Sequence, residues 1–109
     1  MTETKKAKAL LPERFPLVAL QQEYSLLERF VERSLLPFCR DLGLTVIAYS
    51  PLAEGRLAKE QDPVLSDVAR RYGLTSAQVA LHWVARQENV LAISATTKCA
   101  HLKSNFDAL

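Results

Sequence analysis

The chain has few cysteines, no long apolar run and no excess of charge of one sign, and each absence narrows its function. Cys39 and Cys99 are the only cysteines, and their spacing suits neither a zinc site nor a redox pair. No apolar run approaches the length needed to cross a bilayer. The polar amino terminus lacks the apolar core of a signal peptide. We therefore expect reduced thiols, no metal site, no membrane partner and a soluble, cytoplasmic protein.

The balance of charge excludes a further class of partner. Lysine and arginine number 14, aspartate and glutamate 12, and the two signs are interspersed, which leaves a net charge of +2. Such a balance gives no electrostatic case for binding nucleic acid. The one basic cluster, Lys5, Lys6 and Lys8, lies at the amino end, where we expect a solvated and frayed terminus.

The length and composition predict one globular domain. A chain of 109 residues with 49% hydrophobic residues is of the usual size and composition for a single domain with its own core. We expect residues 1–15 to form an amino-terminal tail or partial helix, and residues 16–109 to form the folded part.

Three short β-type segments, 17–23, 44–49 and 90–94, alternate with helical segments. The second and third are nearly continuous apolar runs, which is typical of strands covered on both faces. Alternation of this kind predicts an α/β fold with parallel strands joined by right-handed crossovers. Three strands leave two open sheet edges.

The predicted helices have recognisable ends. Segment 28–42 ends at Gly43, and Pro37 belongs in its first regular turn because proline is tolerated there. The last helix covers roughly residues 98–108.

The middle of the chain carries two stronger helix signals. Asp62 followed by Pro63 marks the start of one helix, and Gly73 marks its end. Thr75 and Gln78 have the spacing of a capping box, which starts the next helix.

The loop after the second strand, residues 49–57 (YSPLAEGRL), carries residue types suited to a cofactor. Tyr49 offers a flat face, and Gly55 allows close approach of a backbone to a ligand. Ligands bind at the carboxyl ends of parallel strands, where this loop begins. Alternatively, the loop is a purely structural turn, in which Pro51 stops the strand and Gly55 supplies a kink.

The loop after the third strand offers a second candidate. Hydroxyls and Lys98 precede the last helix, whose free amides and dipole favour an anion. His101 and Asn105 are four residues apart and so share one helical face. Alternatively, Thr96 or Thr97 caps the helix, and the basic side chains are only solvated.

Together these segments resemble the carboxyl-terminal part of the aldo-keto reductase family. Four segments carry the resemblance in the family's order: 21–27 (QQEYSLL), 36–39 (LPFC), 48–57 (AYSPLAEGRL) and 77–83 (AQVALHW). Asn105 also stands twelve residues after Ile93, as in the family signature. The resemblance covers nearly all of the chain from Pro16 onward.

The resemblance implies a partial TIM (β/α)8 barrel, in which the three strands correspond to the sixth, seventh and eighth. It also implies NADP(H) as cofactor and hydride transfer between carbonyl and alcohol. Gln21 would bind the nicotinamide carboxamide and Tyr49 would stack on the ring. The residues implied at the pyrophosphate are Ser50, Leu52, Gly55 and Leu57. Those implied at the adenosine and its 2′-phosphate are Ala95, Thr96, Thr97, His101 and Asn105.

The chain also departs from the family pattern. His101 stands where the family usually has Arg or Gln, and Ser94 and Ala95 differ from the usual residues after the last strand. Histidine is only partly charged near neutrality, so the sequence leaves NAD(H) open beside NADP(H). None of the tyrosines, Tyr24, Tyr49 and Tyr72, lies in the family's catalytic motif. We therefore expect no catalytic residues here, and a truncated or split reductase that keeps the cofactor side and works with a complementing barrel fragment.

Two readings from other classes remain open. Residues 68–79 resemble a helix-turn-helix of a DNA-binding regulator, although the second helix is mostly apolar where a recognition helix needs exposed polar residues. The open sheet also fits a non-catalytic α/β module that self-associates through its edges.

Overall fold

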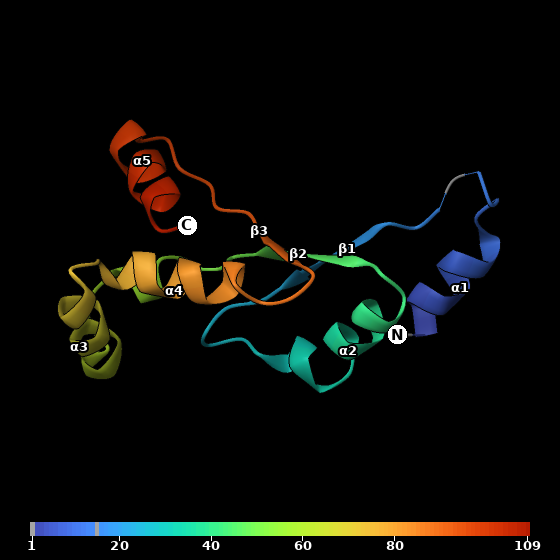
Figure 1. Cartoon of the computed structure of the whole chain (residues 1–109), viewed down its shortest axis with the longest axis horizontal. Helices are drawn as coiled ribbons and strands as arrows, with labels where there is room; N and C mark the ends of the chain where they lie inside the picture. Colours follow the sequence, from blue (N-terminus) through green and yellow to red (C-terminus); the bar gives the residue numbers. More distant parts are fainter. Residues whose placement is uncertain (1, 15) are drawn as a thin grey trace.

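A computed structural model describes residues 2–14 and 16–109. Its centre is a parallel sheet of β1 (Ala19–Glu23), β2 (Thr45–Tyr49) and β3 (Val90–Ala92), in that order (Figure 1). This confirms the predicted fold class of three parallel strands alternating with helices.

Helical segments connect the strands. Between β1 and β2 lie the short 3-10 helix η1 (Phe30–Arg33) and α2 (Leu35–Asp41). Between β2 and β3 lie η2 (Arg56–Ala58), α3 (Pro63–Tyr72) and α4 (Ser76–Ala85). The last helix, α5 (Cys99–Asp107), follows β3.

The first helix, α1 (Thr2–Leu10), precedes β1 and contains no buried residue. It lies at the opposite end of the molecule from α5 (Figure 1). The predicted boundary at residue 15 falls on a residue outside those that the structure describes, so the division into 1–15 and 16–109 stays a prediction.

The predicted ends of α3 and α4 are confirmed by their hydrogen bonds. Asp62 accepts from the backbone N–H of Leu65 at 2.8 Å, and Gly73 ends α3 in the left-handed region at φ 66°. In the capping box of α4, the N–H of Gln78 donates to the Thr75 hydroxyl at 3.1 Å, and the Gln78 side chain accepts from the Thr75 N–H at 3.0 Å.

The regular helix within 28–42 begins at Leu35, which confirms that Pro37 stands in its first turn, where its missing N–H costs no intrahelical bond. The predicted strands are each shorter in the structure, and the first two begin at Ala19 and Thr45 instead of residues 17 and 44. The third strand ends at Ala92 instead of residue 94. Its partner β2 stops at Tyr49, since Ser50 turns away with φ 49°, so no backbone remains for Ser94 to pair with.

One face of the sheet is buried under α2 and α4. Val46 and Ala48 of β2 are fully buried against Leu36 and Cys39 of α2 and Val84 of α4. A second cluster, Ala53, Leu57, Leu65 and Ala80, holds the loop after β2 onto α3 and α4. Apolar burial of this kind is the main stabilising term of the fold.

The opposite face of the sheet is uncovered, so the expectation that the second and third strands are covered on both faces is wrong. Gln21, Ile47 and Leu91 form one row across the three strands. Leu91 is 54% exposed and Tyr49 38% exposed. No described segment packs there, because every covering helix lies on the side of Val46 and Ala48.

In the parts of the chain that the structure describes, no helix combines the length and apolarity of a bilayer span. The same residues contain no cluster of three or more His, Cys, Asp or Glu side chains arranged to hold a metal ion.

A polar cluster around the buried Tyr24 fixes the segment after β1. The hydroxyl of the fully buried Tyr24 donates to Glu32 at 2.8 Å, and Arg29 donates to both oxygens of the same carboxylate. The Arg29 guanidinium also lies 4.9 Å from the centre of the Trp83 ring, which meets the Tyr24 ring edge-on. Burial, followed by the hydrogen bond to Glu32, raises the pKa of Tyr24.

We predict that Tyr24→Phe lowers the free energy of unfolding by about 1–2 kcal/mol, because it removes a partly buried hydrogen bond to a carboxylate. The raised pKa of Tyr24 means that its contribution is present below the unfolded pKa of about 10 and is lost as the pH rises further. Urea unfolding at pH 7 and pH 10.5 should therefore show a smaller alkaline loss in Tyr24→Phe than in the unmodified chain. Tyr72→Phe, at a ring that is 75% exposed, is the matched control and should change neither value. Equal behaviour of the two variants would contradict the role of Tyr24.

Candidate cofactor-binding site

The loop after β2 is held in a strained conformation at the carboxyl end of the sheet. Ser50, Ala53 and Glu54 have φ values of 49°, 51° and 56°, in the left-handed region that non-glycine residues rarely adopt, and Gly55 follows at 85°. Backbone hydrogen bonds, such as Ala53 N–H to Ser50 C=O at 2.9 Å, stabilise the turns. Strain of this kind concentrates in segments that bind ligands.

In this loop, sequence patterns indicated only Gly55 as a residue with an unusual backbone conformation. Nothing marks Ser50, Ala53 or Glu54, because these residue types disfavour the left-handed region. The packing of Ala53 and Leu57 into the second core cluster holds them there, and such packing is visible only in three dimensions.

The segment after β3 leads into α5 and lies beside the same loop. The N–H of Ile93 donates to the Ala48 carbonyl at 3.0 Å, and the Asn105 amide donates to the Ser94 hydroxyl at 3.3 Å. The Thr96 hydroxyl accepts from the N–H of Lys98, the N-cap residue of α5, at 3.1 Å. The Lys98 side chain makes no capping bond to the first amides of α5.

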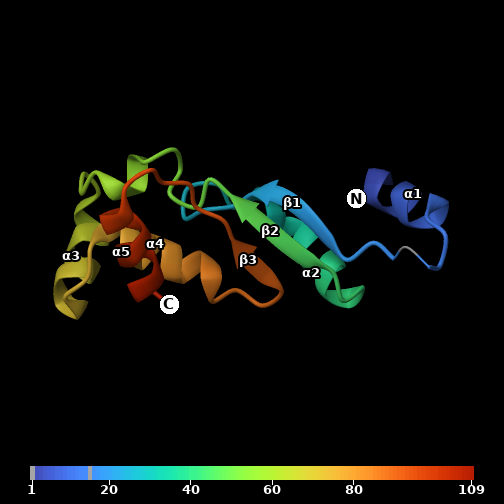
Figure 2. The same ribbon diagram turned by 90° about the horizontal axis from the view of Figure 1, so that it is seen from above.

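Helix α5 is anchored on α4. The Gln78 side chain donates to the Ser104 carbonyl at 3.0 Å, and Nδ1 of His82 lies 2.7 Å from the Ala108 carbonyl oxygen. These bonds place the start of α5 beyond the tip of β2, on the same side as the loop after β2 (Figure 2).

A continuous groove runs between the two loops. Its larger part, about 630 Å³, begins at the exposed ring of Tyr49, and its smaller part, about 310 Å³, runs along α5. Leu52, Ala95 and His101 are among the residues that line both parts, which joins them into one groove. The volume is in the range of small-molecule sites.

Most of the expected cofactor residues line this groove. In the larger part these are Tyr49, Ser50, Leu52, Gly55, Ala95 and His101. In the smaller part they are Leu52, Ala95, Thr96, His101 and Asn105.

Three expected residues do not line it. Gln21 lies on the uncovered sheet face, two residues before Glu23, the partner of Tyr49 in the ladder. Because side chains alternate along a strand, Gln21 and Tyr49 share this face and are roughly 7 Å apart along the strand direction. The Leu57 side chain is buried in the second core cluster, and Thr97 is exposed beside Thr96.

The groove also contains residues that the sequence analysis did not assign to the cofactor. Glu54 lines its larger part, Glu60 its smaller part, and Ser94 both. For Ser94, the position directly after Ile93 is an available signal. For Glu60, which follows η2, no pattern in the sequence indicates the groove.

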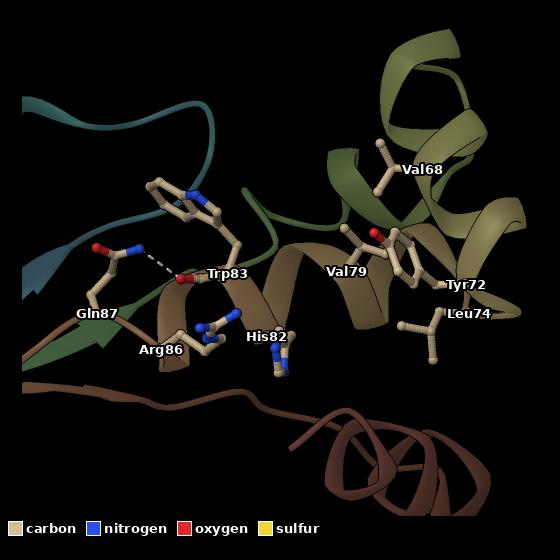
Figure 3. Close-up of a pocket in the computed structure, with 8 residues that line it drawn as sticks. All are labelled: Val68, Tyr72, Leu74, Val79, His82, Trp83, Arg86 and Gln87. Atoms are coloured by element: carbon tan, nitrogen blue, oxygen red, sulfur yellow. Dashed lines mark hydrogen bonds between the residues drawn. The ribbon is translucent and has the colours of Figure 1, made fainter.

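A separate cavity lies between α3 and α4 (Figure 3). Tyr72, Val79 and Trp83 are among its lining residues, and none of them lines the groove at the strand ends. Trp83, the single tryptophan of the chain, would therefore not contact a ligand bound in that groove.

The surroundings of α4 argue against a DNA-binding helix-turn-helix. Its residues Ser76, Ala80, Leu81 and Val84 are buried. A recognition helix must instead present an exposed polar face to the bases.

Comparisons with known proteins agree with this geometry. The model of the Aldo/keto reductase family matches residues 2–109. The chain is 32% identical to "Probable aldo-keto reductase 1" of Glycine max, over 86% of this chain and 36% of that protein. It is 38% identical to "Methylglyoxal reductase YeaE" of Escherichia coli K12, over 79% of this chain and 31% of that protein.

A solved structure gives the same result. The crystal structure of an aldo/keto reductase from Klebsiella pneumoniae, in complex with NADP and acetate, superimposes with a TM-score of 0.86 at 35% identity. The match covers 99% of this chain and 39% of that one. The chain thus spans about a third of the length of the curated relatives it matches. On the family match across residues 2–109, with the parallel strands in the arrangement of the solved relative, this chain belongs to the aldo/keto reductase family.

Proposed function

We propose that the chain forms the part of an aldo/keto reductase that binds the nicotinamide dinucleotide, equivalent to the sixth to eighth strands of the barrel. The observation that carries this proposal is the groove at the carboxyl ends of the strands, bordered by the strained loop after β2 and the start of α5. The Klebsiella relative, which holds NADP, supports it. Ligands of (β/α)8 barrels bind at this end of the strands.

The residues of the groove suit the chemistry of such a ligand. Tyr49 offers a ring face at one end, and Ser50 and Ser94 offer hydroxyls next to it. Helix α5 contributes His101, Ser104 and Asn105 to the other part. When bound, the reduced nicotinamide supplies a hydride for a carbonyl substrate.

We assign each expected residue a role that its position supports. Tyr49 stacks on the nicotinamide, and Gln21, on the same sheet face, contacts its carboxamide. The residues at the pyrophosphate are Ser50, Leu52 and Gly55. Those at the adenosine are Ala95, Thr96, His101 and Asn105. Leu57 and Thr97 act indirectly. Leu57 anchors the loop in the core, and Thr97 extends the turn before α5.

In this proposal the proton donor for the carbonyl comes from outside the chain. Carbonyl reduction requires an acid positioned at the oxygen. The hydroxyl of Tyr24 is buried and bonded to Glu32, and Tyr72 lies on α3 in the separate cavity. That leaves Tyr49 as the tyrosine in the groove, where its ring serves the cofactor.

The uncovered sheet face is where the rest of a barrel would pack. Ile47 and Leu91 lie on this face, and the side chains of a barrel interior form a packed core. Self-association through the same face is the competing use. Sedimentation of the isolated chain separates the two, because a folded monomer leaves self-association without support.

We predict that the chain binds NADH or NADPH, and that Tyr49→Ala weakens binding roughly tenfold, because stacking on an aromatic face contributes about 1–3 kcal/mol per ring. The fluorescence of the reduced nicotinamide, followed during titration, measures this. Tyr72→Ala, at the exposed ring on α3, is the matched control and should bind like the unmodified chain. Absence of binding to either dinucleotide, or equal losses in the two variants, would contradict the proposed site.

We also predict that the missing part of a barrel, supplied in trans, restores carbonyl reduction. The segment of the Klebsiella relative that precedes the matched region is a suitable complement. Leu91→Lys should abolish assembly, since it places a charge on the face to be buried. Leu102→Lys, at a side chain on α5 that is 62% exposed, should not affect assembly. A soluble complex that binds the dinucleotide but reduces no aldehyde would count against the proposed role in catalysis.

A further inference from the structure

The charges that line the groove are unusual for a site that receives an anionic cofactor. Glu54 lines the larger part and Glu60 the smaller part, and both are exposed acidic side chains. Among the described residues, no lysine or arginine lines either part. His101 is the only other titratable side chain that lines the smaller part.

The basic residues of the flanking segments do not line the groove, and these include Lys59, which directly precedes Glu60. Lys98 directly precedes α5 but does not line the smaller part, and the Lys103 ammonium is paired with Asp107 at 2.6 Å. In the loop after β2, Nε of Arg56 donates to the Ala53 carbonyl at 3.4 Å. The smaller part therefore has a carboxylate and neutral polar groups, but no fixed positive charge.

This part is where the proposed function places the adenosine ribose. NADP(H) carries a 2′-phosphate there, with about 1.5 to 2 negative charges at pH 7, whereas NAD(H) carries a hydroxyl. Proteins hold the 2′-phosphate with arginine and hold the 2′-hydroxyl with a carboxylate that accepts its hydrogen bond. Within the described chain, no hydrogen bond or ion pair engages the Glu60 carboxylate, which leaves it able to accept one.

We propose that the adenosine end of this groove selects NAD(H) over NADP(H), with Glu60 as the residue that discriminates between the ribose hydroxyl and the ribose phosphate. The selection rests on the proposed function for the position of the dinucleotide, and goes beyond it in naming the form that is bound. It also separates this chain from the Klebsiella relative, whose structure holds NADP.

The chain offers a closely matched control for Glu60. Glu54 and Glu60 are the same residue type, both are exposed, and both have a left-handed backbone, with φ 56° and 52°. Replacing either by glutamine removes one negative charge, and the position still requires the same left-handed backbone conformation. The two differ in position, because Glu54 lies in the larger part with Tyr49 and Glu60 lies in the smaller part with Asn105.

The test is titration of the full chain and its variants with NADH and NADPH, at pH 8 and low salt, by nicotinamide fluorescence. We expect the unmodified chain to bind NADH roughly threefold or more tightly than NADPH. The Glu60 carboxylate repels the 2′-phosphate of NADPH, and this repulsion is modest because the site is partly exposed to solvent. Glu60→Gln should shift the ratio of the two dissociation constants toward NADPH by roughly fivefold, which corresponds to about 1 kcal/mol. Glu54→Gln should change both constants together and leave the ratio within about twofold.

Several results would overturn the inference. Tighter binding of NADPH by the unmodified chain, or an unchanged ratio in Glu60→Gln, would remove the selecting role of Glu60. A Lys98→Gln variant that loses affinity for NADPH alone would show that a cation reaches the 2′-phosphate after all. In these cases the dinucleotide still binds and the proposed function stands. Failure of both dinucleotides to bind would instead overturn the proposed function and the selection together.

Discussion

The structure depends on the burial of one face of the central strand, β2. This strand is hydrogen-bonded on both sides, to β1 and to β3, and its buried residues Val46 and Ala48 contact α2 and α4. Because the helices are held by this apolar contact, the positions of both crossovers follow from it. The three carboxyl ends then meet at one edge, as parallel pairing requires.

The same constraint creates the groove. At the end of β2 the chain leaves a strand that is buried on one face and enters a loop with four consecutive or near-consecutive residues of positive φ. Such a loop persists only when surrounding packing holds it, and here Ala53 and Leu57 are fixed against Leu65 and Ala80. Helix α5, held by its bonds to Gln78 and His82, forms the other wall. Rigid elements thus position a loop-built site, a common arrangement in enzymes of this architecture.

The partial family match and the exposed sheet face are consistent with each other. The chain aligns with 39% of the Klebsiella reductase, and in the described residues nothing covers the row of Gln21, Ile47 and Leu91. Residues that point into a closed barrel are normally packed in layers. The apolar character of Ile47 and Leu91 predicted burial, but among the described residues no segment covers this face.

Local patterns in the sequence were sufficient for the element types and for several helix ends. Asp62, Gly73 and the pair of Thr75 and Gln78 act through bonds within one or two helical turns, so their chemistry can be read from spacing alone. The parallel sheet followed from the alternation of strands and helices, and the loop at Tyr49 from its position after a buried strand. These predictions rest on short-range interactions or on general rules of chain connection.

Tertiary structure alone decided the rest. It placed the side chain of Leu57 in the core, brought Glu60 to the wall of the groove and left one sheet face open. The left-handed residues Ser50, Ala53 and Glu54 are likewise invisible in the sequence, since their own preferences oppose that conformation. The physical reason is common to all of them: each depends on contacts between segments far apart in the chain, whose combined packing outweighs local preference.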